Sequence, residues 1–246
     1  MKESRHLTRQ ERLEHNPNLS KKSVEIVSKI LSNNDKKAME LRERYKALNV
    51  YVVNLMSSPG SGKTTLLESF SACEAFRFCV LEGDLQTNRD AKRLLQCGVS
   101  AYQISTGEAC HLEAAMIESA LNELEKQCDF ALMDYLFIEN VGNLVCPASY
   151  DLGASLNLVL LSTPEGDDKV LKYPTMFMCA DAVVISKADL IEHFVFDVER
   201  VKADLHQLKA DVPVFLVSSK DRASIENIRD FITQSHVRNY HSTYQF

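Results

Sequence analysis

The sequence lacks the features of secreted and membrane-spanning proteins. Its first residues, MKESRHLTRQERLEHNP, contain no apolar core of the kind that a secretory signal needs. No run of apolar residues approaches the roughly 18 that a helix needs to cross a membrane. We therefore expect no membrane contact and a cytoplasmic location.

Two further absences concern charge and cysteine pairing. The chain has no basic excess, because 34 acidic against 28 basic side chains give a net charge of −6. Broad contact with nucleic acid needs a basic surface, so we expect no nucleic-acid partner. The seven cysteines follow no regular framework, which favours free thiols over disulfides. In a reducing compartment, a cysteine beside a histidine is more readily a metal ligand or a nucleophile than half of a disulfide.

The order of predicted elements indicates an α/β fold. Apolar, β-branched segments alternate with amphipathic ones along most of the chain, and the apolar segments are continuous, as burial on both faces predicts. We therefore expect a mostly parallel sheet flanked by helices. The predicted strands span 50–57, 76–83, 99–105, 130–140, 155–163, 182–186 and 212–219, and the predicted helices span 63–73, 86–98, 112–127, 168–179, 197–210 and 224–234.

The stretch SSPGSGKTT, residues 57–65, predicts a phosphate-binding P-loop. It lies between the first strand and the first helix and matches G-x-x-x-x-G-K-[ST], except that Ser57 replaces the first glycine. The glycines let the backbone curl so that successive N–H groups face phosphate oxygens. Lys63 is expected to reach the β- and γ-phosphates, and the Thr64 hydroxyl to ligate Mg²⁺. The predicted nucleotide-binding residues of the loop are Gly60, Ser61, Gly62, Lys63, Thr64 and Thr65.

Residues after two later strands favour guanine over adenine. Ser186-Lys187-Ala188-Asp189 stands where guanine-binding proteins carry N-K-x-D. The Asp189 carboxylate can accept two hydrogen bonds from guanine, and the Lys187 stem can lie over the base. Ser186 replaces an asparagine whose amide ties neighbouring loops together, so we expect that tie to be lost. Ser219 and Lys220, after the last strand, resemble the S-A-K loop that also contacts guanine.

Two acids at strand ends complete the predicted catalytic site, with Lys63, Asp84 and Glu139 as its catalytic residues. Asp84 is suited to Mg²⁺ or to the attacking water, and Thr64, Asp84 and Glu139 are the expected Mg²⁺ ligands. Glu139 lies three residues before Gly142, which resembles a D-x-x-G loop whose glycine N–H faces the γ-phosphate. Asp134 is the competing acid, but we place it in mid-strand and rank it second.

Cys110, His111 and Cys146 form a predicted metal site. The first two follow the third strand, and Cys146 lies four residues past Gly142, so all three are expected at the nucleotide edge. Thiolate and imidazole suit Zn²⁺ or Ni²⁺, and a two-fold pair of subunits would supply six ligands. Simple packing of these side chains stays open. A cysteine–histidine nucleophile is disfavoured, because adjacent residues point in different directions and no orienting acid is evident.

The chain divides into two predicted parts. Residues 49–246 form a P-loop GTPase domain, and residues 1–48 form a polar leader and an N-terminal helix. This helical extension, over residues 19–48, is expected to pack on the domain or to bind a partner. Its predicted apolar side consists of Val24, Ile26, Val27, Ile30 and Leu31.

Six stretches between about residues 50 and 220 together resemble the HypB hydrogenase maturation GTPases, of the SIMIBI class. They are SPGSGKTTLLE, GDLQTNRDAKRL, STGEACHLEAAM, FIENVGNLVCPASYDLG, EGDDKVLKYPTMF and SKADL. The resemblance implies a slow, Mg²⁺-dependent GTPase, converting GTP to GDP, that delivers nickel to [NiFe]-hydrogenase precursors. It also implies GTP-dependent homodimerisation, a HypA-type nickel chaperone and the hydrogenase large-subunit precursor as partners, and metal held by Cys110, His111 and Cys146. Lys169 is implied to contact nucleotide across the dimer.

Other interpretations remain. Residues 1–48 contain no cysteine and only His6 and His15, so a separate tight nickel site there is not expected. A urease-accessory GTPase would carry a C-P-H triplet, whereas Cys146-Pro147 is followed here by Ala148. A metal-binding module whose nucleotide site only gates dimerisation is a further alternative, and so is an ATP-dependent kinase. The sequence does not choose between nickel and zinc.

Overall fold

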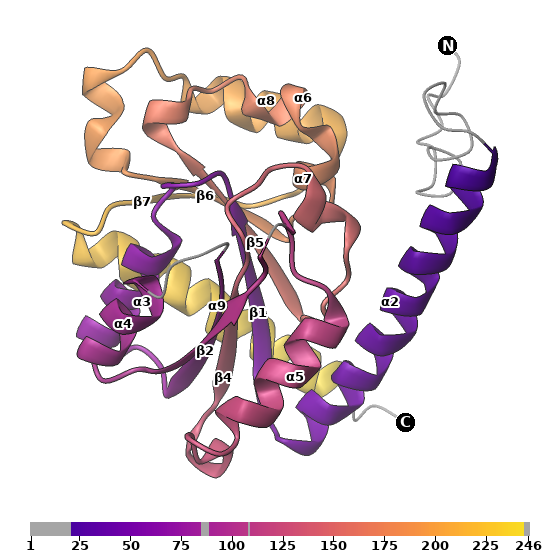
Figure 1. Cartoon of the computed structure of the whole chain (residues 1–246). Helices are drawn as coiled ribbons and strands as arrows, with labels where there is room; N and C mark the ends of the chain where they lie inside the picture. Colours follow the sequence, from indigo (N-terminus) through magenta and orange to yellow (C-terminus); the bar gives the residue numbers. More distant parts are fainter. Residues whose placement is uncertain (1–20, 85–88, 108, 244–246) are drawn as a thin grey trace.

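The computed structural model describes residues 21–84, 89–107 and 109–243 of the 246-residue chain, with side chains from residue 27 to residue 238 within those ranges. A central sheet has helices on both faces, as expected for an α/β fold (Figure 1). None of the helices in these ranges is long and apolar enough to cross a membrane.

The sheet has seven strands in the order β3-β2-β4-β1-β5-β6-β7, and every neighbouring pair is parallel. The central strands β1, β4 and β6 are buried over their full length, whereas the edge strands β3 and β7 are partly exposed. Because all strands run the same way, the segments that follow them meet at one edge. The strands are β1 (Tyr51–Ser57), β2 (Phe78–Asp84), β3 (Ser100–Ser105), β4 (Tyr135–Glu139), β5 (Leu156–Ser162), β6 (Ala182–Ser186) and β7 (Val214–Val217).

Three apolar clusters join the helices to the sheet. One face is covered by α3 (Lys63–Ala72), α4 (Arg89–Gln96) and α9 (Arg222–Thr243). The other is covered by α2 (Lys21–Ala47) and α5 (Ala114–Leu124) over one half, and by α6 (Lys169–Lys172), α7 (Pro174–Met178) and α8 (Val198–Leu208) over the other. The short 3₁₀ helix η1 (Phe130–Leu132) lies between α5 and β4. Three others follow strands β4, β5 and β6 in turn: η2 (Cys146–Ser149), η3 (Thr163–Glu165) and η4 (Ala188–His193).

The N-terminal helix α2 packs against α5, along the right of Figure 1. Its apolar side differs in part from the predicted one, because Ile30 is 45% exposed while Leu31 is buried. The buried stripe continues through Ala38, Leu41 and Tyr45 at helical spacing. The side chains of Val24 and Ile26 and residues 1–20, His6 and His15 among them, lie outside the description. The division of the chain at residue 48 stays a prediction.

The predicted strand 130–140 is shorter in the structure. Asp129 accepts a hydrogen bond from the Ala131 N–H and caps η1, so β4 begins only at Tyr135. Asp134 therefore precedes the strand, and our mid-strand placement was wrong. Its carboxylate pairs with Arg77 at 2.6 Å, and its carbonyl accepts from the first residue of β1. This is the end of the sheet opposite the P-loop, so Asp134 cannot serve as the competing metal ligand.

The predicted helix 168–179 is two short helices. Pro174 has no N–H to donate to the preceding turn, and its ring disfavours helical geometry at Tyr173. Tyr173 accordingly has φ −126° and ψ 54°, which separates α6 from α7.

Candidate functional site

The P-loop connects β1 to α3 as predicted. Gly60 and Gly62 have φ of 72° and 93°, a region that favours glycine, and this turns the backbone into the loop. Lys63 begins α3 and is buried, with Nζ donating to Ser57 Oγ at 3.0 Å. Burial lowers the pKa of Lys63, while the charge of Glu139 acts in the opposite direction. The loop therefore places a buried lysine amine where the negative charge of a phosphate would pair with it.

A carboxylate that the sequence did not single out also contacts the P-loop. Glu165, in η3 after β5, accepts hydrogen bonds from the hydroxyls of Ser58 and Ser61, the latter at 2.5 Å. Its position directly after a central parallel strand was the available signal. These contacts tie the P-loop to the segment that leads to Lys169.

Glu139 and Thr64 lie together at the end of β4. Thr64 Oγ1 donates to Glu139 Oε1 at 2.7 Å, while the buried Oε2 has no partner among the described residues. Burial raises the pKa of Glu139 to about 7, against the opposing effect of Lys63. An orphaned carboxylate oxygen beside a hydroxyl is the hard oxygen donor set that Mg²⁺ prefers, so these residues fit the predicted cation.

Two other acids border this position. Glu82 of β2 is the register partner of Glu139, is buried, and also has an Oε2 without a partner in the described ranges. Burial, followed by the charge of Glu139, raises the pKa of Glu82 to about 8. The sequence analysis missed Glu82, although it stands two residues before Asp84. Asp84 closes β2 on the same edge, and its carbonyl accepts from Thr106 N at 3.1 Å.

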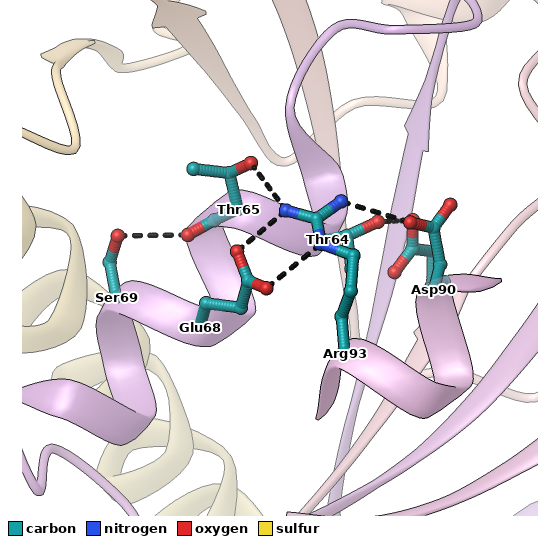
Figure 2. A network of polar contacts seen from close by, with 7 residues as sticks. Thr64, Thr65, Glu68, Ser69, Asp90 and Arg93 are labelled. Carbon is teal, nitrogen blue, oxygen red and sulfur yellow. Dashed lines mark hydrogen bonds and ion pairs between the residues drawn. The ribbon is translucent and has the colours of Figure 1, made fainter. Parts of the chain in front are cut away.

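An ion-pair network joins α4 to α3 (Figure 2). Arg93 donates to both carboxylate oxygens of Glu68, at 2.9 and 2.7 Å, and to Asp90 at 2.9 Å. A longer contact of 3.3 Å reaches the Thr65 hydroxyl. These bonds fix α4 to α3, the helix that carries Thr64.

Three of the residues predicted to recognise guanine, Lys187, Asp189 and Ser219, line a cavity of about 140 Å³ beside the P-loop. Asp189 accepts from Lys220 Nζ at 2.7 Å and from Ser218 Oγ at 2.8 Å, and these bonds lower its pKa. Lys187 Nζ donates to the Gly60 carbonyl at 2.9 Å. Ser219 lines the same cavity. The structure therefore brings the two predicted base-recognition loops together with the P-loop.

Ser186 overturns one expectation. Its hydroxyl donates to the Ser61 carbonyl at 2.6 Å, and Thr163 donates to the Ser186 carbonyl at 3.1 Å. The tie between the P-loop and the end of β6 is therefore present. A short hydroxyl suffices because the end of β6 lies buried directly against the loop.

Cys110, His111 and Cys146 meet as predicted. Their ligand atoms all lie within 4.8 Å of one another, the two Sγ atoms are 2.8 Å apart, and Cys110 Sγ is 3.8 Å from His111 Nδ1. All three side chains are half-buried. Burial and the neighbouring Cys110 raise the pKa of the Cys146 thiol, and a hydrogen bond from Asn143 opposes this shift. Two thiols and an imidazole nitrogen are a donor set for Zn²⁺ or Ni²⁺.

The imidazole of His111 is held from two sides. Its Nε2 lies 3.4 Å from a Glu113 carboxylate oxygen, and its ring stacks on Tyr150 with centroids 3.9 Å apart. Our expectation that no acid orients this histidine was therefore wrong. A hydrogen on Nε2 leaves the Nδ1 lone pair on the side of the thiols, which is the usual arrangement of a metal-binding histidine. The close approach of two thiols favours metal binding over a nucleophilic pair.

The phosphate and metal sites are joined at Gly142. A methyl group on this residue would lie 2.7 Å from Pro59 Cα and 2.9 Å from Pro59 N. Gly142 therefore lies directly against the P-loop, four residues before Cys146. Lys169 begins α6 with Nζ 5.9 Å from the Tyr173 ring centroid, and its predicted contact across a dimer stays a prediction.

Comparisons with known proteins show which family this chain resembles. The family model described as CobW/HypB/UreG, nucleotide-binding domain, matches residues 51–216. The chain is 74% identical over 240 residues to the hydrogenase/urease maturation factor HypB of Helicobacter hepaticus, covering 98% of this chain and 99% of that protein. A crystal structure of HypB from Helicobacter pylori in complex with nickel is 61% identical, with a TM-score of 0.83, and covers 87% of this chain and all of that one. HypB from Archaeoglobus fulgidus is 36% identical with a TM-score of 0.73, over 82% of this chain and 98% of that one.

Proposed function

This chain belongs to the CobW/HypB/UreG family and matches its HypB maturation factors over nearly its whole length, and from this we propose that it is a GTP-hydrolysing nickel metallochaperone for hydrogenase maturation. The observation that carries the proposal is the position of the cysteine–histidine cluster. The short segment from Glu139, which Thr64 contacts, to Cys146 connects this cluster to the P-loop.

The nucleotide part of the proposal rests on the loops at the sheet edge. The P-loop N–H groups and Lys63 bind the phosphates, and Asp189 with Lys187 selects guanine, supported by Ser219 and Lys220. Thr64, Glu139 and Asp84 would hold Mg²⁺, which supplies charge neutralisation at the β- and γ-phosphates. Asp84 orients the attacking water, and the Gly142 N–H contacts the γ-phosphate.

The metal part rests on Cys110, His111 and Cys146, with nickel as cargo and zinc able to use the same ligands. Three ligands do not close a site, so a second subunit supplies the rest and the γ-phosphate favours the dimer. Lys169 reaches the nucleotide of that second subunit. Because both ligands act on one conformational equilibrium, nucleotide state and metal affinity influence each other reciprocally.

The clients and location belong to the same proposal. A nickel chaperone of the HypA type supplies the metal and a hydrogenase large-subunit precursor receives it. A urease client is a second candidate, because the relatives from Helicobacter are named hydrogenase/urease maturation factors. A cytoplasmic location fits the chemistry, since Cys110 and Cys146 must remain reduced to bind metal.

Hydrolysis separates this proposal from a module whose nucleotide site only gates dimerisation. Purified protein is expected to release phosphate from GTP and not from ATP, and Lys63→Ala to abolish that release. Lys172→Ala removes an exposed lysine of α6 that pairs with Asp168, so it is the matched control and keeps wild-type turnover. If wild-type protein binds GTP without hydrolysing it, the proposed GTPase is excluded and a metal-binding module whose nucleotide site only gates dimerisation remains. A preference for ATP would indicate a kinase.

A further inference from the structure

A short segment with little freedom connects the two sites. It begins at Glu139, to which Thr64 donates, and the next residue, Asn140, is buried with its N–H bonded to the Leu55 carbonyl at 3.0 Å. Gly142 then lies against Pro59, too close for any side chain. The segment is therefore fixed at its start and pressed against the P-loop at its centre.

Asn143 extends from this segment to both cysteines. Its Nδ2 donates to the Cys110 carbonyl at 3.4 Å, and its side chain lies near enough to the Cys146 thiol to lower the pKa of that group. Its Oδ1 accepts from Val145 N at 2.8 Å, which fixes the side chain in an Asx turn. One side chain thus joins two metal-ligand segments that are 36 positions apart in the chain.

We propose that Asn143 is the positioning residue that couples the nucleotide site to the metal site, a role that rests on the proposed function above. A group that accepts a hydrogen bond from the Gly142 N–H either moves Gly142 away from Pro59 or presses it more closely against that residue. The adjacent Asn143 follows, and its hydrogen bonds carry the change to Cys110 and Cys146 together. The separation of the two thiols, and with it the affinity for metal, then depends on what occupies the phosphate site.

A second connection between the sites exists and serves as the competing route. Thr106 N donates to the Asp84 carbonyl at 3.1 Å, and Ala109 N donates to the Thr106 carbonyl at 3.1 Å, next to Cys110. This route reaches one cysteine through main-chain bonds, with a further contact of 3.5 Å from the Thr106 hydroxyl to the Asp84 carbonyl, and a substitution at Asn143 leaves all of these bonds in place. Asn143 reaches both cysteines through a side chain that can be removed, which makes the two routes separable by mutation.

The test compares nickel affinity in two nucleotide states. The dissociation constant for Ni²⁺ is measured on the full chain by competition with a chromophoric chelator, with GDP and with a non-hydrolysable GTP analogue. Wild type is expected to show a ratio of about 5-fold or more between the two states. Asn143→Ala is expected to bring the ratio within about 2-fold of unity, whatever it does to the absolute affinity.

The matched control is Glu113→Ala. It also removes a side-chain contact of 3.4 Å to a residue of the metal cluster. The Glu113 side chain makes no capping bond to α5, which is capped by the main-chain carbonyl of Glu113, and an alanine keeps that carbonyl. The substitution is expected to weaken Ni²⁺ binding by about 10- to 100-fold in both states and to leave their ratio unchanged. A merely structural role for Asn143 would give this same pattern.

Asn143→Ser guards against misfolding, because a serine hydroxyl still caps the Val145 N–H but is too short to reach the Cys110 carbonyl. As for Asn143→Ala, the ratio of its Ni²⁺ dissociation constants in the two nucleotide states is expected to lie near unity. A wild-type ratio retained in folded Asn143→Ala or Asn143→Ser overturns the inference and assigns the coupling to the Asp84–Thr106 route. A ratio of unity in the wild-type protein shows that nucleotide and metal binding are not coupled, and it therefore excludes a coupling role for Asn143. Wild type that binds no nickel in either state removes the proposed function.

Discussion

Substituting Gly142 by alanine tests the contact between the P-loop and the segment that leads to the metal site. Gly142 is not among the residues with positive φ, so alanine brings no backbone strain of its own. The added methyl would instead lie 2.7, 2.9 and 3.2 Å from Pro59 Cα, N and Cβ. Two of these atoms are main chain and cannot rotate away, so either the P-loop or the segment must move.

The magnitude follows from that crowding. An extra methyl in a close-packed contact typically costs about 1–3 kcal/mol, and a gain of about 0.4–1 kcal/mol from the less flexible unfolded chain offsets part of it. We therefore expect Gly142→Ala to lower the free energy of unfolding by about 1–2 kcal/mol. Because the displaced atoms belong to the P-loop, GDP and GTP affinity should also fall.

The assay is urea denaturation followed by circular dichroism, combined with nucleotide titration of the folded protein. Gly98→Ala is the matched control, because Gly98 has φ of 78° and open space around it. It should cost about 1–2 kcal/mol through backbone strain alone and leave nucleotide affinity unchanged. A Gly142→Ala protein with wild-type stability and wild-type nucleotide affinity would refute the contact.

Other predictions address the N-terminal helix, the base pocket and the metal ligands. Leu41→Ala, which truncates a buried side chain between α2 and α5, should lower the free energy of unfolding by about 2–4 kcal/mol. Ile30→Ala on the exposed side should change the free energy of unfolding by less than about 0.5 kcal/mol. If Leu41→Ala and Ile30→Ala change this free energy equally in urea denaturation, the described packing of α2 is contradicted. Asp189→Asn should weaken GTP binding by about 10²-fold or more and leave ATP binding unchanged in fluorescence titrations, because it removes a charged acceptor for guanine. Cys146→Ala should lower Ni²⁺ affinity by at least about 10-fold in chelator competition while leaving GDP binding unchanged, and an unaltered nickel affinity would exclude this residue as a ligand.

Much of the fold was predictable because the chain carries strong local signals. The continuous apolar strands predicted a sheet buried on both faces, and every strand pair is indeed parallel. Local signals also explain two errors, since Asp129 and Pro174 are capping and helix-breaking residues whose effects outweighed the apolar pattern around them. The apolar side of α2 was misjudged because the buried stripe is decided by where α5 lies, which no local pattern contains.

The site was predictable where residue type and position after a strand coincide. The P-loop, the two base-recognition loops and the cysteine–histidine cluster fall in this class. The contacts of Glu165 with Ser58 and Ser61 were not predictable, because they join segments about a hundred residues apart through side chains of ordinary type. Ser186 was misread for a related reason, since the reach of a hydroxyl depends on how close β6 ends to the P-loop.

If GTP turnover drives the handling of nickel, hydrolysis and metal transfer must be coupled in time, and a single experiment can follow both. The protein is first loaded with Ni²⁺ and GTP, and hydrolysis is started by adding Mg²⁺. Phosphate release and the transfer of Ni²⁺ to a colorimetric chelator are then followed in the same sample. We expect the rate of metal transfer to change in step with phosphate release, and Lys63→Ala to abolish both changes. Identical transfer from wild type, from Lys63→Ala and from wild type loaded with GDP would contradict it.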